Sequence, residues 1–302
     1  MNSQYIFIAH DLGGGEAIND FIKLKKINPL IISSGPSKEL LARYKQIDFS
    51  SLNDFVSKYI ENKKVEIIVG TGWGDYEINW MEKLSSKKIK FSVIFDNWIF
   101  FKERLFKSES KTIIKPNKIY LLNDDAYNHA LTLFKVYEIK IINLKISNDY
   151  SNLKKIIRKI MPNTLYKIRY ISQPLRELSS YSESSKYSRF KMPLLDQHKI
   201  FMELVNVLLP KMKCEVCSTI INPHPAEDDL SFQKWNSLLF KLKDKNIDIQ
   251  NFDKEKVSDN ELVFGFNSVA LLKASTKSYI SFSLCDYVSW KEKLPHKHIY
   301  NL

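Results

Sequence analysis

Residues 4–18, "QYIFIAHDLGGGEAI", decide the fold of this chain. The stretch opens with an apolar run typical of a buried strand, passes through a polar segment with three glycines and continues into a helical pattern. Further apolar runs that end in polar or glycine residues follow at 29–34, 65–72, 91–96 and 118–123, with segments of helical period between them. Strands that alternate with helices predict a parallel sheet built from βαβ units.

The second half of the chain repeats the alternation. Apolar runs predict strands at 165–174, 214–225, 248–252, 261–266 and 277–283, and helical patterns cover 196–212 and 232–245. A lysine-rich stretch at 145–163 fits a linking helix, and the polar insert at 177–193 fits a loop. The sequence therefore predicts an α/β protein with two tandem Rossmann-like domains, residues 1–150 and 151–302.

The overall charge favours an anionic partner without choosing one. The 302 residues include 46 basic and 34 acidic side chains, a formal net charge of +12. The lysines are scattered, and neither an aromatic RNA-binding strand nor zinc-finger spacing accompanies them, so we expect a solvated surface and no nucleic-acid partner.

Cysteine use and the N-terminus indicate a cytoplasmic protein. A zinc site needs four ligands, but Cys214 and Cys217 have no second pair, so we expect these cysteines and Cys285 to be core thiols and expect no metal. There is no basic segment before a long apolar core and no apolar run long enough to span a membrane.

Three glycines follow the first strand directly. Gly13, Gly14 and Gly15 would let a substrate approach the backbone and would point amides at an anion. The segment lacks the last glycine of the dinucleotide motif and the Lys-Ser/Thr of a P-loop. Two interpretations stay open, a plain tight turn and a loop that contacts a substrate, which would be the acceptor.

Carboxylates stand beside tryptophans after two of the predicted strands. Asp75 and Glu77 lie in 70–80, "GTGWGDYEINW", and Asp96 lies in 95–104, "FDNWIFFKER". A carboxylate next to apolar rings is partly desolvated, which raises its pKa toward the range useful for a general base. Each could instead serve only the fold, as Asp75 would by capping the helix that follows it.

A histidine between two prolines ends a strand of the second half. Pro223 and Pro225 stiffen the backbone around His224, so its imidazole could be aimed at a phosphate or a leaving group. A later strand ends at 265–266, and Asn267 and Ser268 start a short helix whose free amides suit an anion. A structural histidine and an ordinary capped helix are the alternatives.

Four segments of the chain resemble bacterial sialyltransferases and polysialyltransferases of the GT-B fold. They are "FDNWIFFKERL", "YISQPL", "NPHPAED" and "VFGFNSVALLKA". The resemblance implies two domains whose parallel sheets face a central cleft, with the C-terminal domain binding the donor. His224 and Ser268 with Asn267 would then contact the phosphate of CMP, and Pro225, Glu227 and Phe266 would complete the donor site. The acidic motif of that family, two carboxylates followed by glycine, is absent, so its catalytic base has no counterpart by position.

We therefore expect a cytoplasmic glycosyltransferase of surface-polysaccharide synthesis that needs no cofactor. It would move an acidic sugar, such as sialic acid or Kdo, from a CMP-activated donor to a glycan or lipid-linked glycan acceptor, with contact to the anionic inner membrane face as a further expectation. Asp75, Glu77 or Asp96 would be the base, and His224 would serve the leaving group. Two alternatives stay open: a UDP-sugar transferase or nucleotide-sugar epimerase of the same fold, and a non-enzymatic glycan- or phosphate-binding protein.

Overall fold

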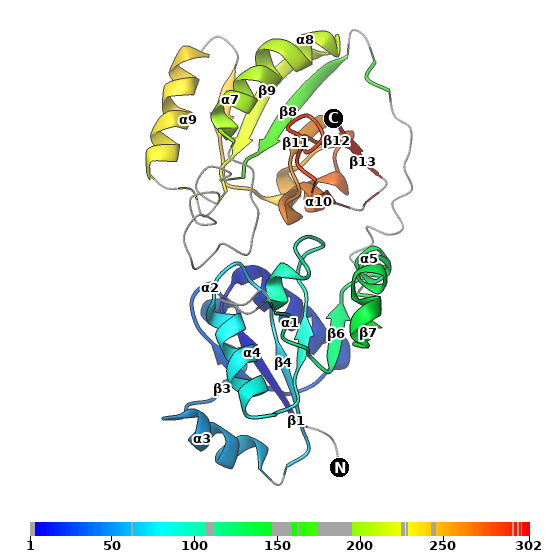
Figure 1. The fold of residues 1–302 in the computed structure, drawn as a ribbon. Coiled ribbons are helices and arrows are strands. Elements are labelled where there is room, and N and C mark those ends of the chain that lie inside the picture. Colours follow the sequence, from blue (N-terminus) through cyan, green and yellow to red (C-terminus); the bar gives the residue numbers. More distant parts are fainter. Residues whose placement is uncertain are drawn as a thin grey trace. The chain divides into compact units, whose positions relative to one another are not determined.

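The structure is a computed structural model in which two compact units each carry one parallel β-sheet (Figure 1). It describes residues 4–61, 63–106, 112–146, 159–161, 164–173, 195–224, 227, 229–242, 246–291, 293–294, 296 and 298–302. The described residues up to 146 belong to one unit, and the described residues from 159 onward belong to the other.

The N-terminal domain holds a seven-stranded sheet with the order β3-β2-β1-β4-β5-β6-β7. All its neighbouring strands pair in parallel. The strands are β1 (Gln4–Ala9), β2 (Leu30–Ser33), β3 (Lys45–Gln46), β4 (Val65–Val69), β5 (Ser92–Ile94), β6 (Lys118–Leu121) and β7 (Lys140–Asn143). The chain fills one side of the sheet from β1 to β3 and then returns to the other side with β4, so the order reverses between β1 and β4.

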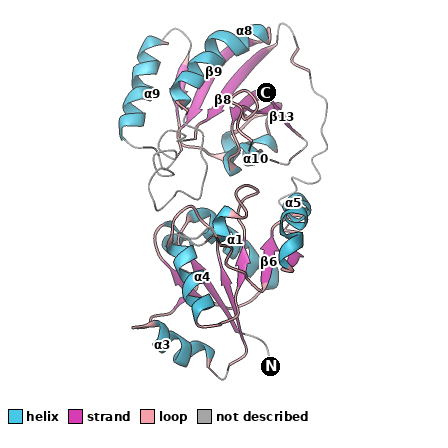
Figure 2. Ribbon diagram, viewed as in Figure 1, coloured by secondary structure: helices cyan, strands magenta, loops and turns pink. Residues whose placement is uncertain are grey.

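The connections place helices on both faces of this sheet (Figure 2). The longer helices are α1 (Leu12–Lys25), α4 (Tyr76–Ser86) and α5 (Asp124–Phe134), and the shorter ones are α2 (Pro36–Leu40) and α3 (Leu52–Phe55). Right-handed crossovers that run in opposite directions from β1 and β4 put α1 and α4 on opposite faces. The central strands are covered on both sides, which is why Ile6, Phe7 and Ile8 are all fully buried although they are consecutive.

The C-terminal domain holds a six-stranded parallel sheet with the order β10-β9-β8-β11-β12-β13. Its strands are β8 (Leu165–Ile171), β9 (Glu215–Asn222), β10 (Ile247–Ile249), β11 (Glu261–Gly265), β12 (Ile280–Ser283) and β13 (Ile299–Asn301). Its helices are α7 (Gln197–Glu203), α8 (Leu209–Lys211), α9 (Asp229–Lys241) and α10 (Val269–Ser275). The strand order reverses between β8 and β11.

The α/β class with two Rossmann-like domains is confirmed, but the local prediction at the glycines is corrected. Gly13, Gly14 and Gly15 lie inside the first turns of α1 and do not form a separate tight turn. The sequence analysis also missed β3, β7 and β13, which are short strands at the sheet edges. Residues 177–193 and most of 145–163 lie outside the described residues.

The cysteines are all free thiols, but they do not all lie in the core. Cys285 is buried, Cys214 is half-buried and Cys217 is exposed on β9, which corrects the expectation of three core thiols. In the described part of the chain, no helix combines the length and the apolar character needed to cross a membrane.

Candidate functional site

Both domains gather polar side chains where their strand order reverses. In parallel α/β sheets, ligands bind outside the carboxyl ends of the strands at such a switch point. In the N-terminal domain these side chains are Asp11, Thr71, Glu77, Asp96 and Arg104, named here the N-terminal cluster. In the C-terminal domain they are Ser172, His224, Glu227, Asn267 and Ser268, named here the C-terminal cluster.

Glu77 ties the end of β1 to the start of α4. Its Oε1 accepts hydrogen bonds from the backbone N–H groups of His10 at 2.7 Å and Asp11 at 3.1 Å. Its side chain is buried, and its Oε2 has no hydrogen-bond partner among the described residues. Burial, with the nearby Asp11 carboxylate, raises the pKa of Glu77, and the two backbone bonds oppose that rise.

Asp96 follows β5 and forms a buried ion pair with Arg104. Arg104 Nη1 lies 2.5 Å from Asp96 Oδ1, and the Thr71 hydroxyl donates to the same oxygen at 3.1 Å. Burial raises the pKa of Asp96 on balance, although Arg104 and Thr71 favour its ionised form. The N-terminal cluster therefore contains two carboxyl groups whose proton affinity is raised, as general base chemistry near neutral pH requires.

Two aromatic rings, Trp73 and Phe100, pack beside the ion pair of Asp96 and Arg104. The guanidinium carbon of Arg104 lies 5.3 Å from the ring centroid of Trp73, and Phe100 meets that ring edge-on at 5.5 Å. Phe100 adopts a left-handed backbone conformation with φ of 55°, which a phenylalanine adopts only when its surroundings hold it there. Trp73 is half-buried, so part of this residue remains exposed beside the carboxylates.

The glycines let these loops approach one another. A β-carbon on Gly13 would overlap Asp96 Oδ2, and one on Gly14 would lie 2.9 Å from the carbonyl oxygen of Thr71. A β-carbon on Gly72 would overlap the Asp11 carboxylate. The Oδ2 of Asp11 accepts the Trp73 N–H at 2.5 Å. The predicted glycine segment and the predicted carboxylates thus meet at one place, although the glycines contact protein groups there.

Asp75 and Gly15, two further predicted site residues, do not belong to the N-terminal cluster. Asp75 occupies the N-cap position of α4, yet its side chain makes no capping hydrogen bond there. The alternative that the sequence left open for Asp75, a side chain that caps α4 by a hydrogen bond, is therefore not observed. A β-carbon on Gly15 would meet the Ser37 side chain of α2.

His224 is held at the carboxyl end of β9 by its own backbone. Its N–H lies 2.9 Å from Ser172 Oγ and 2.8 Å from Glu227 Oε1, and both can accept it. Ser172 follows β8, so the contact joins the ends of two neighbouring strands. Burial lowers the pKa of His224 and the Glu227 carboxylate opposes this, and the net shift favours the neutral imidazole. A neutral imidazole can donate one hydrogen bond or accept one proton.

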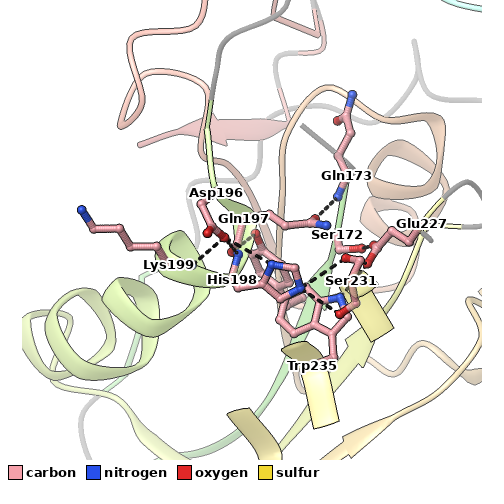
Figure 3. A network of polar contacts seen from close by, with 10 residues as sticks. Ser172, Gln173, Asp196, Gln197, His198, Lys199, Glu227, Ser231 and Trp235 are labelled. Carbon is pink, nitrogen blue, oxygen red and sulfur yellow. Dashed lines mark hydrogen bonds and ion pairs between the residues drawn. The ribbon is translucent and has the colours of Figure 1, made fainter. Parts of the chain in front are cut away.

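Glu227 is buried and bonded to protein groups. Besides the His224 N–H, it accepts from the hydroxyls of Ser172 and Ser231 and from the indole N–H of Trp235 (Figure 3). The sequence analysis placed Glu227 among donor-binding residues, and in the structure its carboxylate bonds the protein groups around it.

The segment after β11 contains the other predicted donor-site residues. Phe266 and Asn267 are fully buried, and the Ser268 hydroxyl accepts the Leu271 N–H at 3.1 Å as the cap of α10. Ser268 is thus a helix cap, and its hydroxyl hydrogen can still be donated. Pro225 lies outside the described residues.

Comparison with known proteins supports the fold. No family model matches the chain, and no curated protein matches its sequence significantly. Among solved structures, the complex of S. aureus MnaA with UDP is similar over 94% of this chain and 79% of that one, with a TM-score of 0.55 and 11% identity. The chain has a GT-B-like fold.

Asp11, Thr71, Arg104 and Ser172 were missed by the sequence analysis. Asp11, Thr71 and Ser172 each come within two residues of a strand end, so polar residues at strand ends would have been a sufficient signal. Arg104 had no such signal, because it belongs to a short 3-10 helix (Glu103–Leu105) well after β5.

Proposed function

We propose that this protein is an enzyme that acts on a nucleotide-activated sugar, with a uridine diphosphate sugar as the favoured substrate. The observation that carries the proposal is the C-terminal cluster, where a half-buried histidine stands near the switch point of a Rossmann-like sheet. Its support is the similarity in fold to a protein solved with UDP. The C-terminal domain would bind the nucleotide.

His224 would donate a hydrogen bond to the phosphate groups. The neutral imidazole, which the lowered pKa favours, carries one ring proton that can be donated to an anionic acceptor. This hydrogen bond would strengthen as negative charge develops on the leaving phosphate. Ser268 would contribute its hydroxyl hydrogen from the cap of α10. Both groups act in the ground state and in the transition state.

The N-terminal domain would supply the general base. Asp96 and Glu77 have raised pKa values, and Asp96 is partly open to solvent, whereas the Glu77 side chain is almost fully covered. Asp96 is therefore the favoured base, with Arg104 and Thr71 holding one of its oxygens. In a transferase it would take the proton of an acceptor hydroxyl; in an epimerase it would take a proton from a sugar carbon.

A CMP-dependent transferase of an acidic sugar is the second candidate. The specific observation in its favour is the order of His224 in a His-Pro dipeptide followed by Asn267 and Ser268 at a helix start, which resembles bacterial sialyltransferases. CMP carries a single phosphate, which one histidine and one serine could serve.

Thermal unfolding with UDP, CMP, CDP, GDP, NAD and a panel of glycans tests these assignments. A ligand at about 100 times its dissociation constant stabilises the folded state by roughly 2.7 kcal/mol. We expect UDP to stabilise most. Greater stabilisation by CMP would move the assignment to the second candidate, and stabilisation by glycans alone would indicate a binding protein. Incubation with UDP-sugars then separates transfer, which releases UDP, from epimerisation, which retains it.

A further inference from the structure

The carboxylate of Glu227 joins three elements of the C-terminal domain. Its Oε1 accepts from the Ser172 hydroxyl after β8 and from the His224 N–H after β9 at 2.8 Å. Its Oε2 accepts from the Ser231 hydroxyl at 2.7 Å and the Trp235 indole N–H at 2.6 Å, both on α9. Figure 3 shows Ser172 and Ser231 next to this carboxylate, with the Trp235 ring below them.

Two hydrogen bonds join His224 and Glu227. The Glu227 N–H donates to the His224 carbonyl at 3.0 Å, while the Glu227 side chain accepts the His224 N–H. The side-chain bond corresponds to the glutamate half of a capping box, and together with the backbone bond it fixes the backbone at His224. The direction of the His224 side chain is therefore tied to the position of one carboxylate.

The donors around Glu227 require an acceptor at both of its oxygens. A backbone N–H and an indole N–H can donate but cannot accept. Trp235 therefore needs an acceptor at Oε2, and the His224 N–H, which Ser172 Oγ also accepts at 2.9 Å, has its shorter bond to Oε1. An ionised carboxylate satisfies both. A glutamine would turn its NH₂ group toward one of the two donors, whichever way the amide is oriented.

Side chains of α7 orient the α9 side of this arrangement. His198 Nε2 lies 3.1 Å from the Ser231 carbonyl oxygen, and His198 Nδ1 lies 3.2 Å from Asp196 Oδ1. The His198 ring also packs on Trp235, with centroids 4.2 Å apart. These contacts of His198 fix Ser231 and Trp235, whose side chains donate hydrogen bonds to Glu227 (Figure 3).

We propose that Glu227 is a positioning residue that sets the direction of the His224 imidazole by bonding the ends of β8 and β9 to α9. The inference rests on the proposed function in that the ligand of His224 is the nucleotide phosphate. Glu227 itself does not touch the nucleotide. It acts through the backbone of His224 and through Ser172.

The first test is a rescue experiment on UDP affinity. Glu227→Gln should weaken UDP binding roughly ten-fold, because one obligate donor faces the new NH₂ group. Trp235→Phe removes the donor at Oε2, so the amide can donate to Ser231 and still accept from His224. Glu227→Gln should then change UDP affinity little in the Trp235→Phe background. Equal losses in the two backgrounds would overturn the proposal.

The second test needs no ligand. NMR titration of the imidazoles, with His224→Ala used to assign the His224 signal, reports the pKa of His224 in each variant. Glu227→Gln should lower that pKa, since it removes the negative charge that favours the imidazolium. Ser231→Ala keeps the charge and should leave the pKa in place. An unchanged pKa in Glu227→Gln would contradict the contact between the two residues.

The two tests keep the failure of the proposed function separate from that of this inference. If UDP does not bind the unaltered protein, the proposed function fails, while the His224 titration still tests Glu227. If Glu227→Gln is too unstable to assay, Glu227→Gln with Trp235→Phe provides the folded comparison. That double variant should have a higher melting temperature than Glu227→Gln alone, and a lower one would contradict the donor conflict.

Discussion

Arg104 Nη1 lies 2.5 Å from Asp96 Oδ1, and this ion pair fixes one oxygen of the carboxylate at the end of β5. The Arg104 side chain is fully buried, whereas the Asp96 side chain retains 13% of its exposure. The other Asp96 oxygen lies against Gly13 of α1. The pair therefore orients Asp96 and joins segments that follow β1 and β5.

Removing Arg104 should destabilise the protein strongly. Arg104→Met leaves Asp96 buried without its cation, a change that costs about 3–5 kcal/mol in buried pairs. Chemical denaturation measures the loss of unfolding free energy. Lys58→Met, which breaks an exposed ion pair with Asp54, is the control and should change stability little. Similar effects of the two substitutions would show that the Arg104 pair contributes no more than a surface contact.

Substitution of the base should reduce turnover without weakening nucleotide binding. Asp96→Asn should lower the catalytic rate by about 10²–10⁴ while the dissociation constant for UDP stays near normal. Asp75→Asn and Glu77→Gln, assayed separately, complete the set. If Asp96→Asn is fully active and one of the others is not, the role of base moves to that residue.

Alanine at position 13 should disturb Asp96. In a helix, Gly→Ala ordinarily stabilises by about 1 kcal/mol, but here the added methyl overlaps the Asp96 carboxylate. We expect Gly13→Ala to destabilise by roughly 1–3 kcal/mol. Gly74→Ala is the control, because its β-carbon would approach Asp11 Oδ1 no closer than 4.0 Å. In an Asp96→Ala background Gly13→Ala should become neutral or stabilising, and a persistent loss would exclude this contact as the cause.

Glu77 should make stability depend on pH in a defined direction. Its folded-state pKa is raised above the ordinary 4.5, so the protonated form is favoured by folding, and stability falls as pH rises through the folded-state pKa. Glu77→Gln keeps an oxygen for the N–H groups of His10 and Asp11 and removes the buried charge. The unfolding free energy of Glu77→Gln relative to the unaltered protein should therefore increase with pH above about 4.5. A constant difference from pH 4 to 8 would argue against a raised pKa.

Loss of the His224 side chain should weaken nucleotide binding. A hydrogen bond to a charged group contributes about 1.5–3 kcal/mol, so His224→Ala should raise the dissociation constant for UDP roughly 10- to 150-fold. Ser268→Ala should weaken binding less, because the amides at the start of α10 remain. Calorimetric titration and a melting curve are needed for each variant. A purely structural His224 would give a lower melting temperature with unchanged affinity.

The sequence by itself determined the α/β class and most of the strands. Strands in the middle of a parallel sheet are covered on both faces, so they appear as unbroken apolar runs such as 4–9 and 65–69. Strands at or beside the edge need no such run, which is why Lys45–Gln46 gave no signal. The sequence also placed Glu77, Asp96 and His224 at or near strand ends, because the end of an apolar run is visible without knowledge of the partner strand.

Only the tertiary structure decided which of these side chains meet. Glu77 lies beside Asp11 because β1 and β4 are neighbours in the sheet, and strand order is not contained in the spacing of apolar residues. Glu227 follows the His-Pro dipeptide and was predicted to bind the donor, and the structure adds that its carboxylate bonds Ser172 and α9. A carboxylate that binds a ligand and one that satisfies buried donors look alike in sequence, because the donors come from elements that folding brings together.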